Sequence, residues 1–196
     1  MSFHKKTIRD VPLDNLTVLV RTDFDTPLNE KGELVSDVRI KSSLPTIEHL
    51  LDRGCKVVII SHFGRVGSQE NISLELAATK LAQLLQRDIR FVSDIVGDRV
   101  AQSIKRSPKG SVIVLENLLF HPGEESNNAD FARNLVSSTG ARYFIQDANW
   151  SVNRSFATTD VITMYIPSVA GILLEQEYMR IASFVPGIDV LLDSNR

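Results

Sequence analysis

Residues 56–65 read KVVIISHFGR, and this segment points to the fold class more directly than any other. Its first five residues, Lys56–Ile60, are apolar at four successive positions, and polar residues follow at once. Four further stretches share this character: Thr17–Val20, Ile89–Val92, Ser111–Leu115 and Arg142–Ile145. Strands that are apolar on both faces are typical of a parallel sheet covered by helices on each side. The five stretches therefore predict the strands of such a sheet.

Longer segments with helical spacing of apolar residues separate these strands. Asp37 to Arg53 predicts one helix, which Gly54 ends and which Pro45 either kinks or starts late. The other predicted helices begin at the N-cap Ser73, run from Asp98 to Lys105, run from the N-cap Asn128 to Gly140, and run from Val169 to Ala182. This alternation predicts an α/β fold, a three-layer Rossmann-like parallel sheet with helices on both faces. We expect one domain over residues 1–168, a linker helix over 169–184 and a tail over 185–196.

Composition excludes several classes of protein. The chain has 196 residues, with Lys+Arg 22 against Asp+Glu 24, so no global positive field indicates nucleic acid as a partner. The longest nearly apolar stretch, Met164 to Leu174, contains Pro167 and is too short to span a membrane. Cys55 is the only cysteine, which excludes an internal disulfide and a cysteine-based zinc site. With a polar N-terminus that does not resemble a signal peptide, these features predict a cytoplasmic protein without a bound metal.

Polar side chains follow four of the predicted strands, where the ligand of an open parallel sheet binds. They are Arg21, Asp23 and Asp25; Ser61, His62 and Arg65; Glu116, Asn117 and His121; and Gln146, Asp147, Asn149, Asn153 and Arg154; Arg39 can join them from the first helix. Guanidinium groups grip carboxylates and phosphates, so an anionic ligand is expected. The alternative is that these residues are solvated, as strand ends are in every α/β protein. Glu124 and Glu125 are expected to be a solvated loop pair, and no nucleotide-binding loop motif occurs.

At these same positions the sequence resembles the N-terminal domain of phosphoglycerate kinase, from about Asp14 to about Tyr178. Residues 20–28, VRTDFDTPL, are similar to the family's R-V-D-F-N-V-P, and 61–65, SHFGR, to S-H-L-G-R. Residues 37–40 with 45–47 resemble D-x-R-I…P-T-I, and 115–127 resemble L-E-N-L-R-F-H-x-G-E-E-x-N. Asp147-Ala148 and Arg154 fall where the family has N-D-A-F-G…H-R. Ala170-Gly171 and Glu175-x-Glu177 resemble its linker helix.

The resemblance implies a function in glycolysis. The N-terminal domain of the family binds 3-phosphoglycerate through a basic patch, and the C-terminal domain binds Mg-ADP or Mg-ATP. Contacts to the phosphorylated metabolite are implied for Asp23, Arg39, His62, Arg65 and Arg154, with Arg39 also stabilising the transferred phosphoryl group. No cofactor is expected for this chain alone, because the nucleotide-binding half would begin in the tail. If Gly187 aligns with the second glycine of the family's G-G-A-K segment, Asp189 stands where a phosphate-binding lysine is expected.

Several family positions are changed. The substrate-binding asparagine is Asp25 here, the arginine of L-R-F is Leu119, the histidine before the last arginine is Asn153, and F-G is Asn149-Trp150. One lost charge-assisted contact plus one repulsive carboxylate costs on the order of 5 kcal/mol, more than a thousandfold in affinity. We therefore expect 3-phosphoglycerate to bind weakly or the site to take another ligand. Alternatively, Asp25 pairs with Arg39 or Arg154 and occupies the patch internally.

Three functions remain open. The chain is the acceptor-substrate half of a phosphoglycerate kinase that is inactive alone, or an inactive paralogue kept as a binding or regulatory module. The third is a structural or oligomerising protein that binds a second domain or protein through the inter-domain face, with the apolar tail as a contact segment. The length of the encoded product separates the first function from the others.

Overall fold

The structure is a computed structural model that describes residues 5–64, 72–148 and 154–184. Its strands are β1 (Thr17–Arg21), β2 (Lys56–Ile60), β3 (Ile89–Val92), β4 (Val112–Leu115), β5 (Tyr143–Gln146) and β6 (Ser168–Ala170). Its helices are α1 (Val38–Ser42), α2 (Leu44–Asp52), α3 (Glu75–Leu85), α4 (Asp98–Arg106), α5 (Pro122–Glu125), α6 (Ala129–Thr139) and α7 (Ile172–Phe184), with 3-10 turns η1 (Leu118–Phe120) and η3 (Val161–Met164).

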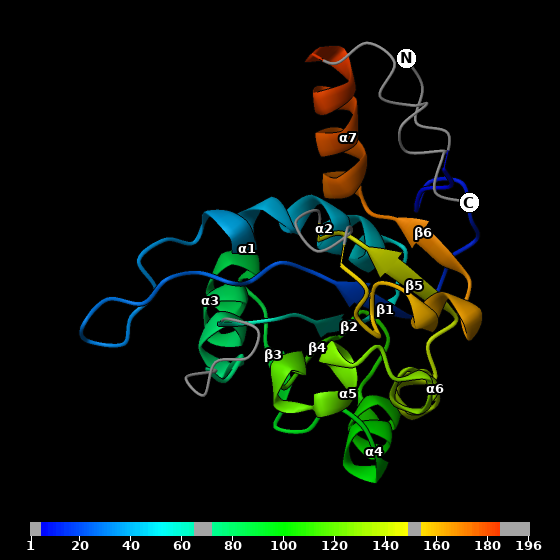
Figure 1. Cartoon of the computed structure of the whole chain (residues 1–196), viewed down its shortest axis with the longest axis horizontal. Coiled ribbons are helices and arrows are strands. Elements are labelled where there is room, and N and C mark those ends of the chain that lie inside the picture. Colours follow the sequence, from blue (N-terminus) through cyan, green and yellow to red (C-terminus); the bar gives the residue numbers. More distant parts are fainter. Residues whose placement is uncertain (1–4, 65–71, 149–153, 185–196) are drawn as a thin grey trace.

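The six strands form one parallel sheet in the order β3-β4-β2-β1-β5-β6. Helices cover both of its faces (Figure 1). Alternate residues of each strand face opposite layers: Val57 and Ile59 pack among α1, α2 and α3, whereas Val58 and Ile60 pack among α4 and α6. The strands β1, β2 and β4 are buried on both faces, as their apolar runs predicted, whereas the edge strand β3 exposes Arg90. The predicted fold class, a three-layer α/β sheet, is confirmed.

The predicted first helix is in fact two helices, α1 and α2, joined at Ser43. Pro45 lies in the first turn of α2, where its missing N–H costs nothing, so the proline begins a second helix instead of kinking one continuous helix. The helix expected from Ser73 begins at Glu75. Ser73 still accepts a hydrogen bond from the Glu75 amide at 3.2 Å, while the Glu116 carboxylate accepts from the Leu74 amide at 2.9 Å. Asn128 caps α6, as predicted, by accepting from the Phe131 amide at 2.8 Å.

The start of the predicted last helix is wrong. Val169 lies in β6, which pairs with β5, and the helix begins only at Ile172, so the linker helix does not start at residue 169. Gly171 separates the two elements, and a Cβ on it would lie 2.0 Å from Asp147 Oδ1. The apolar run 169–174 fits both a buried strand and a helix, and pairing with β5 decides for the strand. From this boundary α7 stands away from the sheet (Figure 1).

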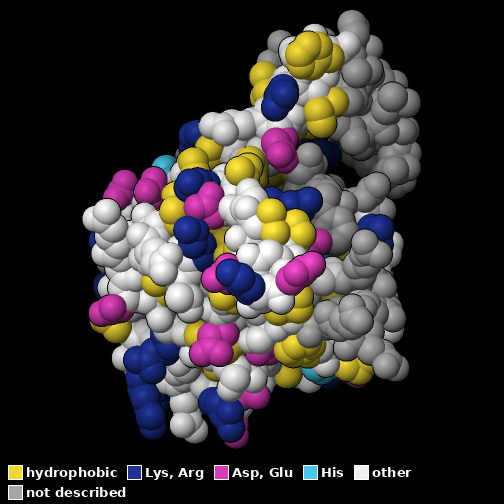
Figure 2. All heavy atoms as spheres, turned by 90° about the vertical axis from the view of Figure 1, so that its left-hand side faces the viewer, with side chains coloured by type: hydrophobic (Ala, Val, Ile, Leu, Met, Phe, Trp, Pro, Cys, Tyr) yellow, Lys and Arg dark blue, Asp and Glu magenta, His cyan; other side chains and the backbone are white. Residues whose placement is uncertain are grey.

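Charges of both signs are interspersed over the face shown in Figure 2, without one dominant basic field. This agrees with the net charge of -2. The outer part of α7 exposes apolar side chains, with Ile181 43% and Phe184 78% exposed. Within the described residues, no helix is both long and apolar enough to cross a membrane.

Candidate functional site

The carboxyl ends of β1, β2 and β5 lie at one edge of the sheet. Arg21 is in register with Ile60 on one side and with Gln146 on the other. The segments that follow are tied together, because Ser61 Oγ accepts from the Phe24 amide at 2.9 Å and the Asp147 amide donates to the Arg21 carbonyl at 2.9 Å. The sheet therefore gathers the predicted rim residues of these three strands, as parallel topology requires.

Arg39 presents its guanidinium to solvent at this rim. It lies in α1, its side chain is 49% exposed, and it forms an ion pair with the Asp23 carboxylate. Burial raises the pKa of Asp23, against the opposing effect of Arg39. The other oxygen of Asp23 accepts from the Asp25 amide at 3.1 Å. Asp23 is thus fixed by its neighbours and holds Arg39 at the rim.

Asp25 does not pair with Arg39, so that part of the expected internal pairing is wrong. Asp25 Oδ1 instead accepts a hydrogen bond from the Gly64 amide at 3.0 Å. The Gly64 amide is a rigid donor close to the half-buried Asp25. Arg39, in contrast, already has Asp23 as its partner. The Asp25 side chain therefore joins the β1 loop to the β2 loop and adds a carboxylate to the rim.

His62 and Arg21 lie beneath the rim rather than on it, because their side chains are only 2% and 1% exposed. Both face Glu124 of α5: His62 Nε2 is 2.9 Å and Arg21 Nη2 3.6 Å from Glu124 Oε1. Glu124 itself is 0% exposed, so its expected role in a solvated loop pair is wrong. Opposite charges and hydrogen-bond donors surround it and make burial tolerable. The substrate contact proposed for His62 stays a prediction.

Other predicted rim residues support the backbone. Glu116 accepts from the hydroxyl of Ser73 at 2.9 Å as well as from the Leu74 amide. Asn117 is fully buried and donates to the carbonyls of Phe63 and Ile72 at 2.6 and 2.8 Å. These two side chains fix both ends of the chain that leads from β2 to α3. Their structural role was missed because it depends on partners more than 40 residues away in sequence.

Two more side chains after β4 face the protein interior. Leu119, where the family has arginine, is 8% exposed and packs as an apolar residue of η1. His121 accepts from the Gly123 amide at 3.0 Å and stacks on Phe131, with ring centroids 4.1 Å apart. Burial lowers the pKa of His121. Both side chains are therefore structural here rather than positioned to bind an anion.

Asp147 follows β5 and caps α7 from outside the helix. Its Oδ1 accepts from the amides of Leu173 at 3.0 Å and Leu174 at 3.4 Å. Burial raises the pKa of this carboxyl to about 7. Asp147 thus determines how α7 leaves the sheet and is a structural member of the predicted rim.

Arg65, Asn149, Asn153 and Asp189 lie outside the described residues. Arg154 is described and exposed, and the Thr159 hydroxyl donates to its carbonyl. The contacts that the resemblance implies for these side chains remain predictions. Among the described residues, no cluster of three His, Cys, Asp or Glu side chains could hold a metal ion.

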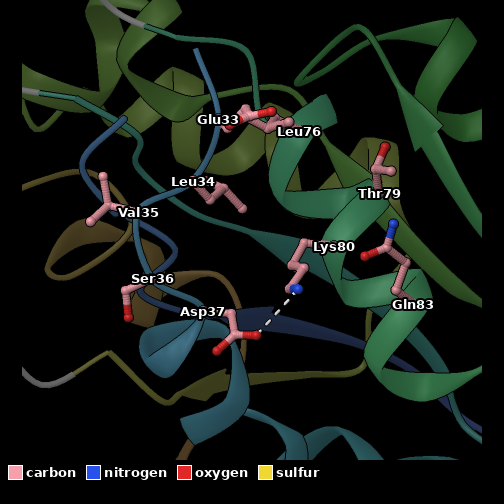
Figure 3. A pocket seen from close by; sticks show the side chains of 9 residues that line it. All are labelled: Glu33, Leu34, Val35, Ser36, Asp37, Leu76, Thr79, Lys80 and Gln83. Carbon is pink, nitrogen blue, oxygen red and sulfur yellow. Dashed lines mark ion pairs between the residues drawn. The ribbon is translucent and has the colours of Figure 1, made fainter. Parts of the chain in front are cut away.

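The hollow in Figure 3 lies apart from this rim, between the loop before α1 and the helix α3. It measures about 680 Å³ and is lined by Glu33, Leu34, Val35, Ser36, Asp37, Leu76, Thr79, Lys80 and Gln83. Its only lysine, Lys80, is 3.3 Å from the Asp37 carboxylate, and Glu33 adds a second acid. The described residues that line the hollow therefore offer no uncompensated positive charge for a phosphorylated ligand.

The comparisons with known proteins agree with the motifs found in the sequence. A sequence model of phosphoglycerate kinase matches residues 8–187. The phosphoglycerate kinase of Coprothermobacter proteolyticus is 41% identical over 174 residues, which are 88% of this chain and 44% of that protein. That of Moorella thermoacetica is 42% identical over 175 residues, again 88% of this chain and 44% of the relative. The chain therefore spans a little under half the length of these curated relatives.

A solved structure gives the same result. The crystal structure of phosphoglycerate kinase from Pyrococcus horikoshii OT3 aligns with a TM-score of 0.84 at 29% identity, and the alignment covers 93% of this chain and 46% of that one. The matched part is the N-terminal domain that the motifs indicated. With the fold, the motifs and both comparisons in agreement, the chain belongs to the phosphoglycerate kinase family.

Proposed function

We propose that the chain is the acceptor-substrate half of a phosphoglycerate kinase, the part that binds 3-phosphoglycerate or 1,3-bisphosphoglycerate in glycolysis. The observation that carries this proposal is the exposed Arg39 guanidinium, held by Asp23 at the carboxyl ends of the strands. A guanidinium in this position suits a carboxylate or a phosphate. Arg65 and Arg154 would complete the patch, as the family resemblance implies.

We also propose that the chain alone does not transfer phosphoryl groups. Its 196 residues cover about half of the matched relatives, and the resemblance assigns Mg-ADP or Mg-ATP binding to the other half. No cofactor is therefore assigned to this chain by itself, and a cytoplasmic location stays a prediction. A coupled assay with Mg-ATP and 3-phosphoglycerate should show no turnover, and turnover above the blank would contradict the proposal.

The binding test is a titration of the full chain with 3-phosphoglycerate, monitored by calorimetry and by NMR chemical shifts. Arg39→Ala should weaken binding about ten- to a hundredfold, the usual loss for one charge-assisted contact. Lys41→Ala is the matched control, because Lys41 lies on the same helix and pairs with Asp37 at 2.9 Å. Equal effects of the two variants would contradict a specific role of Arg39.

A second candidate is an inactive paralogue that acts as a binding, regulatory or oligomerising module. Asp25 and Leu119 favour it, since one adds a carboxylate to the rim and the other buries an apolar side chain where the family has arginine. The exposed Ile181 and Phe184 on α7 are suited to a second domain or protein. Under this candidate the native chain binds 3-phosphoglycerate only at millimolar concentrations, and micromolar binding would exclude it.

A further inference from the structure

Glu124 is the centre of a buried polar network that the proposed function does not use. Its carboxylate contacts side chains from three other segments: Arg21 of β1, His62 after β2 and Thr158 in the loop that follows Arg154. Thr158 is also 0% exposed. Four polar side chains are thus packed together beneath the rim without contact with solvent.

The hydroxyl of Thr158 connects the two charged members. It accepts a hydrogen bond from Arg21 Nε at 2.7 Å and donates one to Glu124 Oε1 at 2.6 Å. The Thr158 amide donates to Glu124 Oε2 at 3.1 Å, and the Ala157 amide donates to the Glu124 carbonyl at 2.9 Å. Side chain and backbone of Glu124 therefore both hold the segment that lies just after Arg154.

The same carboxylate sets the chemistry of the His62 ring. An ionised carboxylate only accepts hydrogen bonds, and its 2.9 Å contact with His62 Nε2 is shorter than the 3.3 Å contact of Arg21 Nη2 with the same nitrogen, so the geometry favours a proton on Nε2. Burial lowers the pKa of His62, with a smaller opposing effect of Glu124, so the ring is neutral near pH 7. Phe156, 5.0 Å away between ring centroids at 73°, packs against the ring. These contacts hold the ring in place and favour the Nε2–H tautomer.

Burial would raise the pKa of Glu124, but the His62 hydrogen bond and the Arg21 charge together lower it. Glu124 is therefore ionised while buried, and Arg21 has its counter-ion. Removing one partner of such a buried pair strands the other charge. Apolar residues could hold the segment without the cost of burying charges. What the Glu124 carboxylate adds is a defined position for His62 and Arg21.

We infer that Glu124 is a positioning residue for the ligand rim: its carboxylate fixes the Nε2–H tautomer of His62 and holds the Arg154 segment against the ends of β1 and β2. This inference rests on the proposed function for its ligand but not for its geometry. Glu124 touches no ligand in this scheme. It acts through His62 and through the chain around Thr158.

The test compares Glu124→Gln and Thr158→Val with the native chain. Glutamine keeps the size and one accepting oxygen but loses the charge. Its NH2 group replaces the oxygen that accepts from the Thr158 amide, so two donors face each other there. Valine removes only the hydroxyl that links Arg21 to Glu124. Glu125→Gln is the matched control, because Glu125 is the neighbouring acid and is exposed.

Two measurements separate positioning from stability. Ring ¹⁵N shifts of labelled histidine, assigned with a His62→Gln variant, report the tautomer of His62. NMR titration with 3-phosphoglycerate, well below the melting temperature, reports binding. We expect the native ring to carry its proton on Nε2 and Glu124→Gln to mix the tautomers. We also expect Glu124→Gln to weaken binding about tenfold or more, Thr158→Val to weaken binding with the tautomer kept, and Glu125→Gln to change neither.

A native ring protonated on Nδ1 alone would overturn the inference. So would a Glu124→Gln chain that melts earlier but keeps the native tautomer and binding midpoint, because that is a purely structural role. If the native chain does not respond to 3-phosphoglycerate, the proposed function fails instead. The histidine ¹⁵N spectra of the native chain and of Glu124→Gln then test by themselves whether Glu124 fixes the tautomer of His62.

Discussion

Replacing Asp147 by asparagine should stabilise this protein, and the gain should grow with pH. Asp147 is buried at the end of β5, and its Oδ1 accepts from the Leu173 and Leu174 amides of α7. Oδ2 is buried and has no hydrogen-bond partner in the part of the chain that the structure describes. Asparagine keeps the accepting oxygen and the volume. The substitution therefore removes the charge and leaves the cap in place.

The magnitude follows from the pKa. Burial raises the pKa of Asp147 to about 7 from an ordinary value of 3.8; the nearby Glu177 also raises it, while hydrogen bonds from Thr46 and α7 oppose the rise. One pKa unit corresponds to about 1.4 kcal/mol, so ionising this carboxyl in the folded state costs about 4 kcal/mol. The folded pKa exceeds the unfolded one. The contribution of the neutral Asp147 carboxyl to the stability of the folded state is therefore complete below about pH 4. This contribution is lost as pH rises through about 7.

The assay is urea unfolding of the native chain and of Asp147→Asn at several pH values between about 4 and 8. The two chains should be similar in free energy of unfolding near pH 4, and the variant should exceed the native chain by up to about 4 kcal/mol near pH 8. Asp88→Asn is the control, because Asp88 is an exposed aspartate. A variant that is less stable than the native chain near pH 8 would refute the reasoning, because the charged cap would then outweigh the cost of burial.

Two further predictions concern single positions. Asp25→Asn keeps an acceptor for the Gly64 amide and removes about 3 kcal/mol of repulsion, so it should strengthen 3-phosphoglycerate binding about a hundredfold in the same titration; unchanged binding would show that Asp25 is not near the ligand. Gly171→Ala places a Cβ 2.0 Å from Asp147 Oδ1 and should cost about 1–3 kcal/mol in urea unfolding, whereas a neutral effect would show that α7 can shift freely at its first turn.

The sequence predicted elements whose signals are local. The strand Lys56–Ile60 was placed at its observed bounds because both of its faces are covered, which makes its apolar run unmistakable. The helix after Asn128 was placed because its cap is local and its end falls at Gly140, which has a φ of 60°. Such signals need only neighbouring residues. The motifs then located the rim, because parallel topology brings strand ends together wherever they fall in the chain.

The depth of each rim residue could not be predicted. Glu124 follows a proline and a glycine in a polar loop, and local pattern alone makes it a surface residue. Its burial depends on His62, 62 positions earlier, and on Thr158, 34 positions later. In the same way, β6 is a strand only because β5 lies beside it. Pairings of this kind form through the whole fold and leave no periodic trace in the sequence.

The distribution of changed residues bears on the two candidate functions. The buried supports of the rim are bonded to one another, since Thr158 contacts both Arg21 and Glu124 and His62 contacts Glu124. Two of the changed family positions are described: Asp25 adds a carboxylate to the rim, and Leu119 packs inside the protein. Four polar groups are buried beneath the rim, at positions where apolar residues are often equally or more stabilising. The buried network is thus in agreement with the proposed anion site, and the Asp25→Asn titration tests the effect of Asp25 on its affinity.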